Sequence, residues 1–164
     1  MKLNIKRIII IIMLLITWII IFKFSSQSGE ESSNVSRGII QKIIDFIPNI
    51  GENQELAERV IRKIAHFSIY TLVGLLLKNL FNTYDIKEKY KIIYSLIIGI
   101  IYAISDEIHQ KFVPGRSAQI TDVMLDSMGV ALGILLVMLV IEIIKKTKKH
   151  KKSQKNLKKK CIMI

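Results

Sequence analysis

Four long apolar blocks run along the chain, separated by two short polar segments and one longer connection. Isoleucine, leucine and valine dominate each block, and each approaches the roughly 20 residues that a helix rising about 1.5 Å per residue needs to cross a bilayer. The blocks predict membrane-spanning helices at about residues 5–24, 64–81, 90–108 and 121–144. We therefore expect an all-α, polytopic membrane protein, in which residues 1–144 form one integral membrane domain built as a four-transmembrane-helix bundle.

The connection between the first two blocks has the pattern of an amphipathic helix. Ser33 or Asn34 can cap this helix, and Pro48 and Gly51 end it. One helical stripe carries its apolar residues, which are Val35, Ile39, Ile40, Ile43, Ile44 and Ile47. The pattern predicts an extracytoplasmic amphipathic helix between spans 1 and 2, on the outer membrane face or over the mouth of the bundle. A helix packed on the protein itself fits the same pattern equally well.

The charge distribution predicts the orientation of the spans. The net charge is +12, and ten of the 25 Lys and Arg residues lie between Lys145 and Lys160, directly after the last apolar block. Basic residues at this place favour a cytoplasmic tail, here residues 145–164, over a nucleic-acid interface. With the N-terminus inside, 17 Lys and Arg lie in inner segments and 8 in outer ones. Both termini are therefore predicted to be cytoplasmic, with the tail disordered near anionic inner-leaflet lipid and no nucleic acid as partner.

The fourth block carries acidic and small residues on one helix face. Asp122, Asp126, Gly129 and Gly133 follow a spacing of four, three and four residues, which places them in one stripe. The Gly129-x-x-x-Gly133 pair allows another helix to approach closely. We therefore predict that this face looks into the bundle and brings both aspartates with it.

The second and third blocks present ionisable residues at the same outer depth. Arg62 and His66 share a stripe of the second block, and the Pro114-Gly115 turn after the third block returns Arg116 beside Asp122 or Asp106. Such groups are costly at a bilayer and usually mark a functional site or a specific pairing. The predicted polar site has these members: His66, Asp106, Glu107, His109, Gln110, Arg116, Asp122 and Asp126.

The residue types in this site allow several kinds of chemistry. Arg62 and Arg116 can hold an anionic group such as a phosphate, because a guanidinium matches its geometry. The carboxylates and histidines can act as acids and bases or bind a divalent cation, or they can simply pair with basic residues and lock three helices together. The sequence contains no Cys/His spacing typical of zinc sites and no phosphate-binding loop, so we predict no resident metal or cofactor.

Four motifs in combination resemble the VanZ-like membrane protein family, over roughly residues 18–140. The motifs are Ser25-Ser26-Gln27, Lys63-x-Ala65-His66-Phe67-x-x-Tyr70, Ser105-Asp106-Glu107-x-His109-Gln110-x-Phe112-x-Pro114-Gly115-Arg116, and Asp122-x-x-x-Asp126-x-x-Gly129-x-x-x-Gly133. Members often carry asparagine where this chain has Asp126, so the aspartate adds a carboxylate. The resemblance implies a four-span protein of the bacterial envelope, similar to the namesake that lowers susceptibility to teicoplanin, a glycopeptide that binds cell-wall precursors.

Together, the outward cluster and the resemblance predict a cell-membrane protein that contacts membrane lipids and binds an envelope molecule. The expected ligand is a lipid-linked cell-wall precursor or a glycopeptide. A membrane enzyme that modifies an envelope lipid or wall precursor is the alternative, and whether the protein is an enzyme stays open. A structural or transport protein is a further alternative, although the almost wholly apolar inner halves of the spans count against transport.

Overall fold

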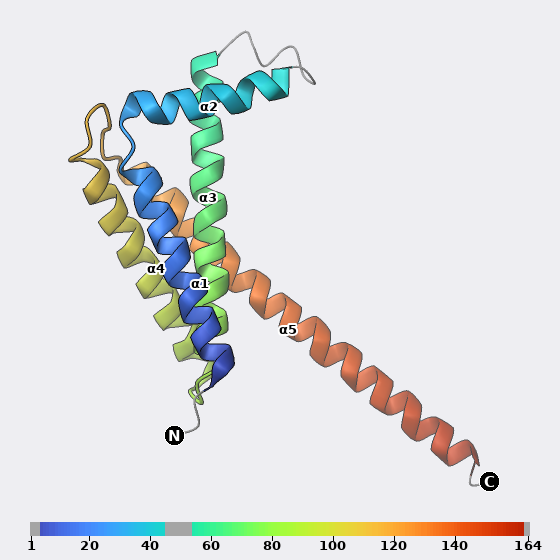
Figure 1. The fold of residues 1–164 in the computed structure, drawn as a ribbon. Helices are drawn as coiled ribbons and strands as arrows, with labels where there is room; N and C mark the ends of the chain where they lie inside the picture. The colour runs from blue at the N-terminus through green and yellow to red at the C-terminus, as the bar shows by residue number, and fades with distance from the viewer. Residues whose placement is uncertain (1–3, 45–53, 163–164) are drawn as a thin grey trace.

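The computed structural model describes residues 4–44 and 54–162, with residues 42–44 and 150–162 described by their backbone alone (Figure 1). Within these residues the regular structure is entirely helical, with α1 (Ile5–Ser25), α2 (Gly29–Ile44), α3 (Gln54–Phe81), α4 (Glu88–Gln110) and α5 (Ile120–Ile162). Four stretches are long and apolar enough to cross a membrane: α1, α3, α4 and residues 120–149 of α5. The predicted all-α architecture with four spans is confirmed.

The lysine-rich tail continues α5 as a helix. Residues 145–162 belong to α5, which projects away from the other helices (Figure 1). The expectation that 145–164 is disordered is therefore wrong for residues 145–162. The local reason is that no glycine or proline follows Gly133 in the described part of α5, and lysine is a good helix former.

Helix α2 lies across α3 at the end of the bundle opposite the N-terminus (Figure 1). Its buried stripe consists of Ser32, Ser36 and Ile40, whereas Val35 is 46% exposed and Ile39 is 44% exposed. The contact with α3 agrees with a helix packed on the protein, and a position of α2 on the membrane face stays a prediction. The predicted apolar stripe is only partly used, because small side chains allow the closest approach to α3.

The start of α2 differs from the predicted one. The helix begins at Gly29, and the backbone N–H of Glu31 donates to the Ser28 Oγ at 3.2 Å while the Ser28 N–H donates to the Glu31 carboxylate at 2.9 Å. These reciprocal bonds form a capping box, which satisfies two backbone groups at the helix start. The predicted caps Ser33 and Asn34 instead lie inside the helix.

Small residues bring α3, α4 and α5 into close contact. A Cβ on Gly74 of α3 would collide with the Val130 carbonyl oxygen of α5, and one on Gly99 of α4 would lie 2.9 Å from the Val130 Cγ2. On the neighbouring turns of α5, Gly129 and Gly133 lie against the α3 backbone. Close backbone approach at small residues is how membrane helices gain contact without a hydrophobic driving force. The face predicted to carry the two glycines therefore points at α3.

The end of the bundle opposite α2 is held by two basic side chains. Arg7 of α1 donates to the Thr83 carbonyl at 2.9 Å, and its guanidinium lies 3.9 Å from the centroid of the Tyr84 ring. Lys78 of α3 is fully buried, and its ammonium lies 2.5 Å from the Glu88 carboxylate at the start of α4. These contacts tie α1 and α3 to the α3–α4 connection.

Candidate functional site

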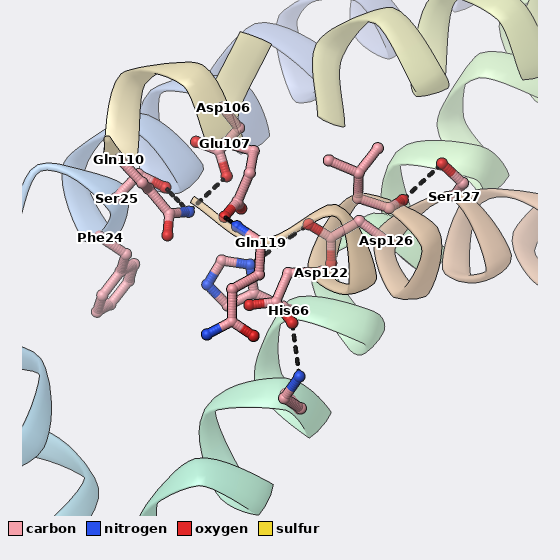
Figure 2. Close-up of polar contacts among 12 residues, drawn as sticks. Phe24, Ser25, His66, Asp106, Glu107, Gln110, Gln119, Asp122, Asp126 and Ser127 are labelled. Atoms are coloured by element: carbon pink, nitrogen blue, oxygen red, sulfur yellow. Dashed lines mark hydrogen bonds and ion pairs between the residues drawn. The ribbon is translucent and has the colours of Figure 1, made fainter. Parts of the chain in front are cut away.

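The polar residues predicted at the outer depth converge from three helices and the turn before α5 (Figure 2). The last turns of α4 bury Asp106 and Glu107, each 5% exposed, together with Gln110, which is 7% exposed. The start of α5 buries Asp126, which is 1% exposed. His66 of α3 completes the group as a partly buried side chain. Several ionisable groups are thus removed from water at one end of the bundle.

Gln110 is the centre of a hydrogen-bond network that joins α1, α4 and the turn. Its amide nitrogen donates to the Asp106 Oδ2 at 3.1 Å and to the Ser25 Oγ at 3.2 Å. Its amide oxygen accepts from the Arg116 Nη1 at 3.0 Å, and the Arg116 Nη2 donates to the Phe24 carbonyl at 3.3 Å. The glutamine therefore uses both ends of its amide to fix the direction of one carboxylate and one guanidinium.

Hydrogen bonds hold the turn between α4 and α5 to α4 on one side and to the start of α2 on the other. The Gln119 backbone N–H donates to the Glu107 Oε1 at 2.6 Å, which gives this buried carboxylate a partner. Gly115 has a φ of +73°, a conformation that glycine adopts without steric cost. The Gly29 N–H donates to the Pro114 carbonyl at 3.0 Å, so the start of α2 rests on this turn. These bonds place Arg116 at the mouth of the cluster.

Two acid–base contacts connect α3 with α5. The Lys63 ammonium lies 2.6 Å from the Asp122 Oδ1, at a partly exposed position. One turn further in, the His66 Nδ1 lies 3.5 Å from the Asp126 Oδ2, which is longer than a normal hydrogen bond. Among the residues that the structure describes, neither Asp126 oxygen has a hydrogen-bond partner. One ligand atom each from His66, Asp106 and Asp126 lie within 4.8 Å of one another.

The two arginines of the site contact neutral oxygens. Arg116 forms no ion pair with Asp122 or Asp106, although the sequence places it beside one of them, and donates to neutral oxygens instead. The Arg62 Nη1 lies 3.5 Å from the Ser33 Oγ. Within residues 4–41 and 54–149, neither arginine forms an ion pair with a carboxylate. Burial lowers the pKa of the Arg116 guanidinium below its ordinary value, and the positive charge of Arg62 acts in the same direction.

Two cavities meet at this cluster. The first has a volume of about 270 Å³ and lies between the ends of α1, α2 and α3, with largely apolar walls that include Ile21, Val35, Ile39, Ile61 and Ile69. The second has a volume of about 410 Å³ and is lined mostly by polar side chains, among them Lys63, Gln110, Asp122 and Asp126. Arg62, His66 and Arg116 line both cavities. The largely apolar cavity and the polar cavity therefore adjoin at these three residues.

One predicted member lies elsewhere, and one contributor was not predicted. The His109 Nε2 lies 3.0 Å from the Ser26 Oγ, and the ring stacks on Phe22 with centroids 4.6 Å apart, so this histidine faces α1 and not the carboxylates. Ser25, which belongs to the Ser25-Ser26-Gln27 motif but not to the predicted polar site, is 1% exposed and accepts the Gln110 bond. Helical spacing explains the first result, because positions 106 and 110 share a stripe that 109 does not.

The comparison with known families agrees with this architecture. The model of the VanZ/LLP1 family matches residues 9–141, which contain α2 and α4, all of the polar cluster and the Gly129–Gly133 contact. No curated protein and no solved structure matches the chain. The family match covers well over half of the 164 residues and bears out the resemblance seen in the motifs. The chain belongs to the VanZ/LLP1 family of membrane proteins.

Proposed function

We propose that this VanZ/LLP1 protein binds the anionic headgroup of an envelope lipid, of the class of lipid-linked cell-wall precursors. The observation that carries the proposal is the shared boundary of the two cavities at Arg62, His66 and Arg116. An amphiphile with a phosphate between its chain and its polar head has the same arrangement of apolar, anionic and polar parts. Each part then has a matching region of the protein.

The arginines supply the recognition of the anion. Arg62 and Arg116 are both partly buried, and each lowers the free energy of an anion placed between them, because neither forms an ion pair with a carboxylate among the described side chains. Burial lowers the pKa of Arg116 and the charge of Arg62 acts in the same direction, so a phosphate bound beside them would favour the charged guanidinium. A guanidinium donates two parallel hydrogen bonds to a phosphate, worth about 1.5–3 kcal/mol per charged hydrogen bond.

Polar side chains along the second cavity serve the polar head of the ligand. Gln110, Gln119 and the Asp122 carboxylate line the polar cavity and can exchange hydrogen bonds with sugar hydroxyls or amides. The apolar cavity beneath α2 receives the first part of the lipid chain, against Val35 and Ile39. Pockets of this kind combine apolar walls with a few polar groups that fix the orientation of the ligand.

The orientation that fits this role has the cluster outside and both termini in the cytoplasm. The excess of basic residues, 17 against 8, supports it through the positive-inside rule. The cluster then faces the compartment in which glycopeptides meet their cell-wall targets. Retention of a lipid-linked precursor by this protein would reduce the access of teicoplanin to its target and so lower the susceptibility of the cell.

Binding of a polyprenyl phosphate to the purified protein in detergent tests the proposal, with native mass spectrometry as the readout. We expect the wild type to bind the polyprenyl phosphate at least tenfold more tightly than the neutral polyprenol of the same length. Arg62→Gln is the cleanest variant, because among the described residues the Arg62 side chain makes a single hydrogen bond, a long one to Ser33. It should weaken binding of the phosphate about 10- to 100-fold, as expected for a charged hydrogen bond.

Lys111→Gln is the matched control, since Lys111 is exposed on the same side and lines neither cavity. It should leave the affinity unchanged. Equal binding of polyprenol, or wild-type affinity in Arg62→Gln, would overturn the lipid-phosphate assignment. Inorganic phosphate should not compete at millimolar concentration, and strong competition would point to a free anion as the ligand.

In cells, Arg116→Ala should restore teicoplanin susceptibility at normal protein levels.

A second candidate is a membrane enzyme that modifies the same class of molecule. The observation that favours it is the His66–Asp126 contact of 3.5 Å beside the buried Asp106, which is an arrangement suited to acid–base catalysis. Extended incubation of the purified protein with the bound lipid, followed by mass analysis, separates the two roles. A lipid recovered unchanged supports binding alone.

A further inference from the structure

We propose that His66, Asp106 and Asp126 form a binding site for a divalent metal ion, with Zn²⁺ as the preferred ion. The three residues come from α3, α4 and α5, and one ligand atom from each lies within 4.8 Å of the other two. Figure 2 shows these side chains directed toward one another at the meeting point of the three helices. The sequence predicts only that these residues lie at one depth, and the packing of the three helices brings their ligand atoms together.

The unsatisfied charge of the cluster is the first argument. Asp126 is 1% exposed, and both of its oxygens lack a hydrogen-bond partner within the described part of the chain. Asp106 is 5% exposed and accepts one bond, from the neutral amide of Gln110. Among the side chains of residues 4–41 and 54–149, no Lys or Arg forms an ion pair with either carboxylate. A buried carboxylate without a partner costs several kcal/mol, and a divalent cation neutralises two of them at once.

Few buried side-chain atoms lack a hydrogen-bond partner in the part of the chain that the structure describes. The buried side-chain atoms without a partner in the described residues number four, and the two Asp126 oxygens account for half of them. Asp126 is also the most deeply buried acid of the cluster. A buried carboxylate oxygen without a hydrogen-bond partner needs a bound cation or a proton to offset its charge. The adjacent imidazole and the second carboxylate supply the further ligand atoms that a metal ion requires.

The geometry and the ligand types select the metal. Zn²⁺ bonds to histidine nitrogen and carboxylate oxygen are about 2.0–2.2 Å long, so two ligands of one ion lie at most about 4.4 Å apart. The His66 Nδ1 and the Asp126 Oδ2 are already 3.5 Å apart, and small side-chain rotations close the remaining distances. A nitrogen ligand beside two carboxylates favours Zn²⁺ or Mn²⁺ over Mg²⁺ and Ca²⁺, which prefer oxygen alone.

The surroundings of the three ligands suit a metal site with an open position. Gln110 holds Asp106 in place, and Ser25 and Arg116 hold Gln110 in turn. Such outer partners orient the ligands of metal sites. Because His66 and Asp126 line the polar cavity, the fourth position faces that cavity. The site rests on the three ligands alone and does not depend on the proposed lipid ligand.

Metal analysis of the purified full-length protein tests the site. Protein freed of its affinity tag is stripped with EDTA, dialysed against Zn²⁺, Mn²⁺ or Mg²⁺, desalted and measured by inductively coupled plasma mass spectrometry. We expect about one Zn²⁺ per wild-type chain. Asp126→Asn should lower the Zn²⁺ affinity at least tenfold, because it removes a charged ligand with little change of shape. Asp122→Asn is the matched control, one turn away on α5 and paired with Lys63, and it should retain the metal.

The thermal midpoint gives a second, independent readout. Zn²⁺ should raise the Tm of the wild type and of Asp122→Asn, since an ion that binds only the folded state stabilises it. It should not raise the Tm of His66→Gln, a variant at a partly exposed position that serves if Asp126→Asn fails to fold. A wild type with less than about 0.1 Zn²⁺ per chain and an unmoved Tm overturns the proposal. Full Zn²⁺ occupancy in His66→Gln does the same. Arg62→Gln should bind Zn²⁺ normally, which separates this test from that of the lipid.

Discussion

Substitution of Gly133 by alanine should weaken the contact between α3 and α5 on which the site depends. A Cβ at this position would collide with the Thr71 carbonyl oxygen and would lie 2.7 Å from the Leu75 nitrogen and 3.0 Å from the Gly74 carbonyl carbon. All three atoms belong to the α3 backbone, so no side-chain rotation can relieve the overlap. Helix α5 must therefore move away from α3 as a unit.

The magnitude follows from two opposing terms. Overpacking of a tight contact costs about 1–3 kcal/mol. Alanine in place of glycine inside a helix contributes about 0.8–1 kcal/mol of stability. Because the colliding atoms are backbone, we expect a cost near the upper end of its range and a net destabilisation of about 2 kcal/mol. That value corresponds to a roughly 30-fold change in the folding equilibrium.

Gly38→Ala separates the two terms. A Cβ on Gly38 of α2 would meet nothing within 4 Å, so this variant keeps the gain in helix propensity without the overlap. Unfolding in mixed micelles with increasing SDS, followed by far-UV circular dichroism, measures both variants. Gly133→Ala should unfold at a lower SDS fraction than the wild type, and Gly38→Ala at the same or a higher one. If Gly133→Ala proves as stable as Gly38→Ala, the close α3–α5 contact is not a determinant of stability.

Two further predictions concern the ends of the bundle. Glu88→Gln should lower the stability by about 2–3 kcal/mol in the same assay, because it leaves the fully buried Lys78 ammonium without its countercharge, whereas Lys78→Met should be close to neutral. Equal effects of the two substitutions would contradict this account of the pair. Ser28→Ala should destabilise the first turn of α2 by about 1 kcal/mol, since it removes the bond from the Glu31 N–H at 3.2 Å. Faster amide exchange confined to that turn would show the loss, and unchanged exchange would exclude a capping role.

Much of the architecture could be predicted from the sequence because the signals are local. A block of about 20 apolar residues specifies a span wherever it occurs, and the four blocks agree with α1, α3, α4 and the first part of α5. The depth of Asp106, Asp122 and His66 could be predicted because each lies near the end of a predicted span. The inward face of α5 follows from the spacing of its glycines. The helical tail was missed because its lysines were interpreted as charge alone, without their helix propensity.

The partners of the site residues could not be predicted in the same way. The sequence places Arg116 near a carboxylate, but the guanidinium binds the Gln110 amide, and Asp122 is taken by Lys63 from another helix. His109 and Gln110 are neighbours in the chain, and yet His109 stacks on Phe22 of α1 whereas Gln110 bonds to the buried Asp106 carboxylate. These outcomes depend on how far each helix is rotated about its axis, which no local pattern states.

The sequence by itself determined the helical class, the number of spans and the level at which the polar groups lie, because these depend on hydrophobicity and helix geometry within each segment. The tertiary structure decided that Asp106, Asp126 and His66 meet, since this requires three helices to pack at set rotations. Contacts such as Val130 between Gly74 and Gly99 set those rotations, and they join residues far apart in the chain. The sequence therefore predicts that these residues share one depth, and their close approach becomes visible only when the helices are packed.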